Sequence, residues 1–213
     1  MDAVRVALLR EVLAGTAWLD ATRRFAGALR HCVDPRGGGL LLVGSPEYEP
    51  WHLAAHLDDE AAWSGLPQLS PTLVRHRVRP GEPAHLAVGP ARLEAVRRGE
   101  TLLVVTPDAP GEQLLERVRG ARRAGATVLA IDGGDRDLRS LAHETLTAPE
   151  TGAGAAGAAG AAPAAVLGLD TAQHLVSAAA GENGLPGPRG RRRFRDRLSR
   201  LAEELMTPPP AGW

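Results

Sequence analysis

The sequence contains no lysine and one cysteine, and each shortage excludes a class of function. All 25 basic residues are arginine, so the chain has neither a P-loop lysine for phosphate nor a lysine that could form a Schiff base. The single cysteine, Cys32, cannot form an internal disulfide or a CxxC metal site. The 25 acidic residues balance the arginines, so no overall charge favours nucleic acid or a membrane as partner.

Long apolar runs are also missing. No stretch approaches the ~20 apolar residues that cross a membrane, and the N-terminus has no apolar core of the secretory type. We therefore expect a cytoplasmic protein. At 213 residues, the chain can form one α/β domain with a sizeable core. Its abundance of alanine, glycine, proline and arginine is typical of a GC-rich, actinobacteria-like genome.

The strongest structural signal is a strand–helix–strand unit between Gly99 and Gly134. Residues 102–106 are a short apolar run ending in threonine, typical of a strand buried on both faces. A loop and an amphipathic helix follow, Gly125 ends that helix, and 127–131 is a second buried strand. A crossover of this length predicts two parallel strands. Ligands bind at the carboxyl ends of such strands, so we expect the site near the loop 106–112.

Helical and strand patterns alternate along the rest of the chain, which favours an α/β fold. The other predicted helices are 51–63, 138–143 and 164–180, together with 3–31 as one long helix or two abutting ones and 91–98 as one or two helical turns. The other predicted strands are 40–43, 72–78, 85–88 and 144–148, the last of them at a sheet edge. We expect Trp18, Trp51 and Trp63 in the core or at an interface.

The composition predicts a single domain over 1–182 and a separate C-terminal segment over 183–213. Residues 151–163 contain almost only glycine and alanine, which predicts a flexible insertion in the domain. An arginine-rich amphipathic helix is expected near 189–200, followed by a disordered tail. These arginines could bind nucleic acid or anionic lipid. One aromatic residue among them and the glutamates that follow favour a solvated helix at a dimer contact instead.

Five segments resemble the SIS (sugar isomerase) domain of the phosphoheptose isomerase type. They are LLLVGS (40–45), WHLAAH (51–56), RRGETLLVVT (97–106), ERVRGARRAGATVLAIDGGDRDLRSLAHETLTAP (116–149) and TAQHLV (171–176). The resemblance implies a three-layer α/β/α sandwich of the flavodoxin/Rossmann type around a five-stranded parallel sheet. It also implies a homodimer or homotetramer with shared active sites, and a sugar derivative as ligand.

The chain departs from this family at the residues that carry its chemistry. The family's phosphate-binding loop is rich in serine and threonine, whereas 106–112 has one hydroxyl, two prolines and two carboxylates. The resemblance places the isomerase's glutamate base near Ala55 or His56, and neither is a carboxylate. Gln173 and His174 match the family's last helix, with a different spacing. These residues make up our predicted ligand site: Gly44, Ser45, Glu47, His52, Thr106, Asp108, Gly111, Glu112 and Gln173.

Each candidate also has a plainer interpretation. His52 and His56 lie one helical turn apart, which can bind a metal ion, but without an HExxH pattern we favour a partly exposed pair and predict no metal. His56 and His174 are the weak catalytic candidates, and a structural role for His174 is favoured.

The acidic candidates have two interpretations as well. Asp108 and Glu112 either cap the helix after Gly111 or bind a ligand. Glu47 and Glu49 either bind a cationic group or an arginine of a neighbouring subunit, or lie in a solvated loop.

Together these features predict a diverged SIS domain that is not an enzyme. Our leading hypothesis is a ligand-sensing or protein-interaction module that acts as a homo-oligomer, without a cofactor. The alternative is an aldose–ketose isomerase of the sedoheptulose 7-phosphate type, with His56 or His174 as base and acid.

Overall fold

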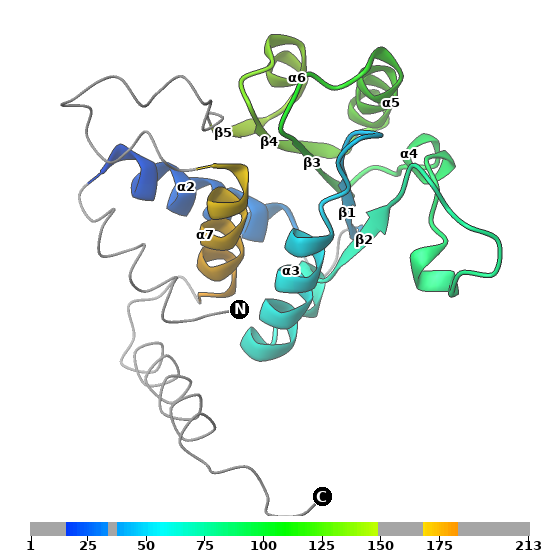
Figure 1. Ribbon diagram of the computed structural model, residues 1–213. Coiled ribbons are helices and arrows are strands. Elements are labelled where there is room, and N and C mark those ends of the chain that lie inside the picture. The colour runs from blue at the N-terminus through cyan, green and yellow to red at the C-terminus, as the bar shows by residue number, and fades with distance from the viewer. Residues whose placement is uncertain (1–15, 34–37, 149–167, 183–213) are drawn as a thin grey trace, which may run out of the picture.

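The computed structural model describes residues 16–33, 38–148 and 168–182, and its centre is a five-stranded sheet (Figure 1). The strand order is β2-β1-β3-β4-β5, and every neighbouring pair is parallel. The strands are β1 (Leu40–Val43), β2 (Pro71–Val74), β3 (Thr101–Thr106), β4 (Thr127–Asp132) and β5 (Glu144–Thr147). The predicted five-stranded parallel sheet and the position of the last strand at its edge are confirmed.

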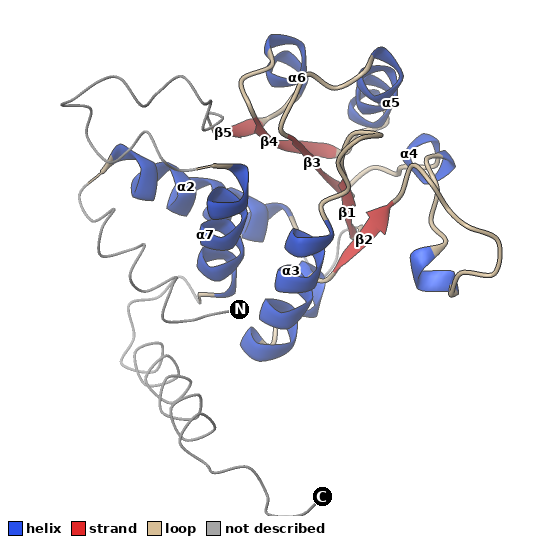
Figure 2. Ribbon diagram, in the orientation of Figure 1, coloured by secondary structure: helices blue, strands red, loops and turns tan. Residues whose placement is uncertain are grey.

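Helices cover both faces of this sheet, as Figure 2 shows. They are α2 (Ala17–Cys32), α3 (Trp51–Ser64), α4 (Ala91–Glu94), α5 (Glu112–Arg123), α6 (Arg136–Leu141) and α7 (Leu169–Gly181), with short 3-10 helices η1 (Pro67–Leu69) and η2 (Ala84–Leu86). None of the described helices combines the length and apolarity needed to cross a membrane.

Side chains of the central strands point alternately into two hydrophobic cores. In β3, Leu103 and Val105 pack with α2, α3 and α7, while Leu102 and Val104 pack with α4, α5 and α6. This alternation follows from the two-residue period of a strand, and burial on both sides explains the continuous apolar runs. The fold is therefore an α/β/α sandwich, as predicted.

The predicted β3–α5–β4 unit forms with nearly the expected boundaries. Gly125, with a φ of 91°, ends α5 in the left-handed conformation that glycine adopts without strain. Gly133 lies so close to β3 that an added Cβ would collide with the carbonyl oxygen of Pro107. These two glycines permit the close return of the chain into and out of β4.

Several expectations need correction. Residues 85–88 are not a strand, because Ala84–Leu86 is a 3-10 helix without buried side chains. The strand predicted over 72–78 ends at Val74. Trp51 and Trp63 are 40% and 52% exposed, so neither belongs to the core, whereas Trp18 packs against it. The predicted insertion at 151–163 and the segment 183–213 lie outside the described residues.

Candidate functional site

The predicted site residues gather where the carboxyl ends of β1 and β3 lie side by side. From β1 the chain continues to β2 on one side, whereas from β3 it continues to β4 on the other side. The direction of the connections therefore reverses between β1 and β3. Such a reversal opens a crevice in parallel sheets. Two loops border it: 44–50 after β1, called the β1 loop below, and 107–111 after β3, called the β3 loop.

Three imidazoles meet between α3 and α7, beside the β1 loop. His52 and His56 lie on the first two turns of α3, and His174 lies on α7. The ring centroids are 4.4 Å apart for His52–His56, 4.6 Å for His52–His174 and 4.7 Å for His56–His174. One nitrogen from each ring lies within 4.8 Å of one nitrogen of each other ring. We call these three residues the histidine cluster.

His56 is the buried member of the cluster. Its side chain is 6% exposed, and neither ring nitrogen has a hydrogen-bond partner among the described residues. Burial first, and then the neighbouring His174 and His52, lower the pKa of His56 to about 4. His56 is therefore a neutral imidazole at pH 7, with at least one lone pair available. The expectation of a partly exposed pair is wrong for His56, whereas His52 is exposed.

The β1 loop is folded on itself and fastened on two sides. An added Cβ at Gly44 would collide with the carbonyl oxygen of Tyr48, so only glycine fits this turn. The Tyr48 hydroxyl accepts a 2.8 Å hydrogen bond from Gln173 Nε2 on α7. Glu47 is exposed and Ser45 is buried. The loop thus lies against α7 next to the histidine cluster, and Gln173 is one of its fastenings.

On its other side, the β1 loop is held by Glu49. Its Oε2 accepts hydrogen bonds from Trp51 Nε1 (2.9 Å) and Arg75 Nε (3.2 Å). Its Oε1 accepts from the backbone N–H of His76 at 3.1 Å. The arginine that binds Glu49 thus belongs to the same chain. Sequence reasoning missed Arg75 and His76, because the strand predicted over 72–78 ran through both positions.

The β3 loop offers few groups to an anion. The Thr106 side chain is fully buried, and its hydroxyl has no hydrogen-bond partner among the described residues. Gly111 is the residue that precedes α5, and no side chain caps that end of the helix. The capping prediction is therefore wrong for Asp108, which is exposed, and for Glu112, which pairs with Arg119 at 2.9 Å.

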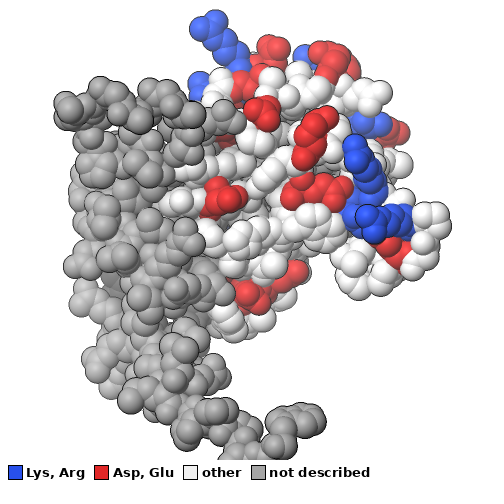
Figure 3. Space-filling model, in the orientation of Figure 1, with Lys and Arg blue, Asp and Glu red and all other residues white. Residues whose placement is uncertain are grey.

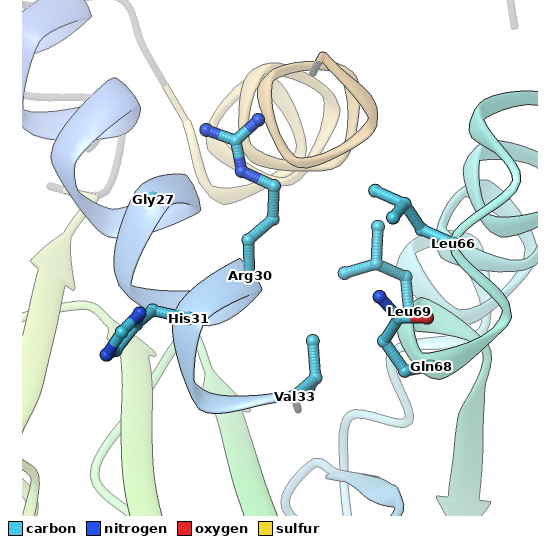
Figure 4. A pocket seen from close by; sticks show the side chains of 7 residues that line it. All are labelled: Gly27, Arg30, His31, Val33, Leu66, Gln68 and Leu69. Atoms are coloured by element: carbon cyan, nitrogen blue, oxygen red, sulfur yellow. The ribbon is translucent and has the colours of Figure 1, made fainter. Parts of the chain in front are cut away.

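A pocket of about 360 Å³ lies at the opposite end of the domain. Figure 4 shows Arg30 extending from α2 into it, with Leu66 and Leu69 facing the same space. Val33 and Leu69, which also line it, precede β1 and β2, so the pocket borders the amino ends of the strands. None of the predicted site residues lines it.

Charge is unevenly distributed over the face shown in Figure 3. Acidic side chains are scattered over its centre and top, and the arginines lie along its upper and right margins. This face of the described residues therefore carries no continuous basic surface.

No protein-family model matches the sequence, and no curated protein matches it significantly. The sugar isomerase domain of an RpiR transcription factor from Sphaerobacter thermophilus matches with a TM-score of 0.51 and 15% identity, over 84% of this chain and 86% of that one.

Two further structures match with lower TM-scores. A candidate phosphosugar isomerase from Silicibacter pomeroyi DSS-3 has a TM-score of 0.48 and 15% identity, over 94% of this chain and 54% of that one. The Vibrio vulnificus NanR protein complexed with ManNAc-6P has a TM-score of 0.43 and 12% identity, over 96% and 76%. The chain has the fold of an SIS domain, and at these identities the similarity establishes the fold alone.

Proposed function

We propose that this chain is a non-catalytic, ligand-sensing module of the SIS fold, and that its histidine cluster binds a divalent transition-metal ion of the zinc class. The observation that carries the proposal is the convergence of His52, His56 and His174, with the buried ring of His56 lacking any hydrogen-bond partner among the described residues. Our prediction of no metal weighed only the pair on α3. The imidazole of His174 on α7 adds a third potential ligand, which favours metal binding.

The donor set suits zinc, cobalt or nickel rather than magnesium or calcium. Imidazole nitrogen is a ligand of the late transition metals, whereas magnesium and calcium prefer oxygen. A tetrahedral zinc site has Zn–N distances of ~2.0–2.1 Å, which places nitrogens about 3.4 Å apart. The cluster's nitrogens lie within 4.8 Å of one another, so modest ring rotations close the gap. Since metal binding requires neutral imidazole, the low pKa of His56 favours it.

Two features support a sensor rather than an isomerase. A general base works best when its pKa is near the working pH, and the pKa of His56 is about 4. Side chains of the β1 loop itself bind Arg75 and Gln173. Asp108 of the β3 loop and Glu112 at the start of α5 are carboxylates where a phosphate would need donors.

The second candidate is a sugar-phosphate isomerase. The observation in its favour is the pair His56 and His174, with ring centroids 4.7 Å apart beside the crevice, which could transfer a proton between adjacent carbons. Incubation of the full chain with sedoheptulose 7-phosphate distinguishes the two: we expect no conversion. Turnover that is lost in His174→Ala would establish the isomerase instead.

The sensing hypothesis also includes a sugar derivative as a second ligand. A thermal-shift screen of the full chain against sugar phosphates and amino sugars tests this point, with inorganic phosphate as the control. A dose-dependent rise in melting temperature for one sugar, absent with phosphate, supports it.

Metal binding is tested by thermal unfolding of chelator-treated, dialysed protein. Zinc, cobalt and nickel at about a hundred times their dissociation constants should each add roughly 2.7 kcal/mol, which is about 5–10 °C for a chain of this size. Magnesium should add nothing. His52→Ala should abolish the response with little change in basal stability, because His52 is exposed.

His85→Ala is the matched control, since His85 is exposed and outside the cluster. It should retain the full response to zinc. Equal zinc responses of His52→Ala and wild type would contradict the proposal.

A further inference from the structure

The Glu49 carboxylate occupies a site built from three donors on two segments that are distant in the sequence. Trp51 Nε1 comes from the start of α3, and Arg75 Nε and the backbone N–H of His76 come from the turn after β2. Arg75 bonds Oε2, while His76 bonds Oε1, so both oxygens of one planar group are used. We call these three donors the carboxylate cradle.

The cradle is held in place by contacts that do not involve Glu49. Arg75 donates to the carbonyl oxygen of Leu86 at 3.2 Å, pairs with Glu82, and lies 4.6 Å from the centre of the Trp51 ring. The His76 ring nitrogen Nε2 lies 2.9 Å from the carbonyl oxygen of Gly44. Removal of the Glu49 side chain would therefore leave Arg75 paired with Glu82, but Arg75 Nε, Trp51 Nε1 and the N–H of His76 would lose their shared acceptor. Donors that are largely shielded from solvent are costly to leave unpaired.

The cradle is also within reach of solvent. The side chains of Glu49 and Arg75 are 17% and 12% exposed, and Trp51 is 40% exposed. Glu49 is attached to the β1 loop, whereas its partners belong to α3 and to the turn after β2. Rotation of the Glu49 side chain toward solvent would therefore open the cradle without moving Gly44, which holds the His76 ring, and without unfolding a helix or a strand. It lies at the carboxyl ends of β1 and β2, where parallel sheets bind ligands.

From this geometry we infer that the cradle is a binding site for the carboxylate group of a small molecule, and that Glu49 is its tethered internal occupant. An incoming carboxylate exchanges with Glu49, whose side chain turns toward solvent. The residue that occupies the cradle is itself a carboxylate, which indicates the ligand class. A monoanionic carboxylate replaces the single charge of Glu49, whereas a dianionic phosphate would add a second negative charge beside Glu82 and therefore fits less well.

This inference is independent of the metal site, since no cradle residue belongs to the histidine cluster. It gives the β1 loop a specific role: the loop competes with the ligand. A tethered group acts at an effective concentration in the millimolar range or above, so weak ligands bind poorly while Glu49 is present.

The test is the full chain carrying Glu49→Ala, titrated with sodium acetate against sodium chloride at the same ionic strength. The readouts are the melting temperature and the change in tryptophan emission on addition of acetate. The emission change should be absent when Trp51→Phe is added. We expect acetate to bind Glu49→Ala saturably, with an affinity at least about tenfold higher than for wild type. Glu49→Gln is the matched control: its neutral amide still fills the cradle, so the gain should be absent.

Two further arms make the result decisive. Glu49→Ala with Arg75→Gln should lose the acetate response, because the charged donor is gone. Inorganic phosphate should bind Glu49→Ala more weakly than acetate. A folded Glu49→Ala without a saturable acetate response overturns the inference, as does an equal response in the double variant. Tighter binding of phosphate overturns the ligand class. Zinc binding by Glu49→Ala should be unchanged, which separates this result from the metal proposal.

Discussion

A buried carboxylate at the end of β4 makes Asp132→Asn a stabilising substitution. Asp132 is fully buried, and its Oδ2 has no hydrogen-bond partner among the described residues. Thr106 is paired with Asp132 in the neighbouring strand β3, and its hydroxyl also lacks a partner among these residues. Burial raises the pKa of Asp132 more than Arg139, the N–H of Gly134 and the side chain of Thr147 lower it. Asparagine keeps the acceptor for Gly134 and removes the buried charge.

The magnitude follows from two opposed effects. The charged Oδ2 costs more to bury without a partner than the neutral amide nitrogen that replaces it, by about 1–3 kcal/mol. The ion pair with Arg139 spans 3.7 Å, and the Arg139 side chain is 40% exposed, so its loss costs at most about 1 kcal/mol. Asp132→Asn should therefore gain roughly 1 kcal/mol at pH 8, which raises the urea midpoint by about 0.5 M.

The stabilisation by Asp132→Asn should also depend on pH. Because the folded-state pKa of Asp132 is raised, the folded chain binds this proton more tightly than the unfolded chain does. Stability should then fall as the pH rises from about 4 through the folded-state pKa, and the cost is present in full above it. The variant and wild type should converge near pH 4 and separate toward pH 8.

Urea unfolding at several pH values is the assay, and Asp108→Asn, at an exposed loop position, is the control. A variant less stable than wild type by about 1 kcal/mol or more at pH 8 would refute the reasoning, since the Arg139 pair would then outweigh the burial cost.

Three further predictions concern the loop, the cluster and the assembly. Gly44→Ala should lose about 1–3 kcal/mol in urea unfolding through overpacking, because its Cβ would collide with the Tyr48 carbonyl; an unchanged midpoint would contradict the closed loop. In chelator, wild type should lose about 1–3 kcal/mol between pH 7 and 4, since unfolded histidine takes up a proton first. The lower limit of about 1 kcal/mol applies if solvent that reaches the cluster past the exposed His52 screens the charge on His56. His56→Gln should lose less, and an equal loss would contradict the low pKa of His56. Light scattering after size exclusion should give a dimer or tetramer, and a monomer would contradict the homo-oligomer prediction.

The strands β1, β3 and β4 could be predicted from the sequence because they are buried on both sides. Their apolar runs need no knowledge of neighbouring elements. Residues 85–88 carry a similar apolar signal, but they overlap the 3-10 helix Ala84–Leu86 and belong to no strand of the described sheet. The strand at 72–78 was predicted too long, because Arg75 and His76 bind the β1 loop instead of continuing the sheet.

The candidate site could be predicted only in part, because its partners are distant in the sequence. The spacing of His52 and His56 predicts that both lie on one face of a helix, but it does not predict a third histidine beside them. His174 joins them through the packing of α3 against α7, which no local pattern encodes. Glu49 and Arg75 likewise meet across 26 positions. The crevice could be located from strand order, whereas the groups that fill it required the tertiary structure.

The most direct test of the central claim is the zinc content of the protein at equilibrium. Chelator-treated full-length chain is dialysed against buffered zinc at pH 7.5, and bound metal is measured by elemental analysis. The account predicts one zinc ion per chain for wild type and His85→Ala, and none for His52→Ala or His174→Ala. Wild type without zinc, or cluster variants that retain it, would contradict the account.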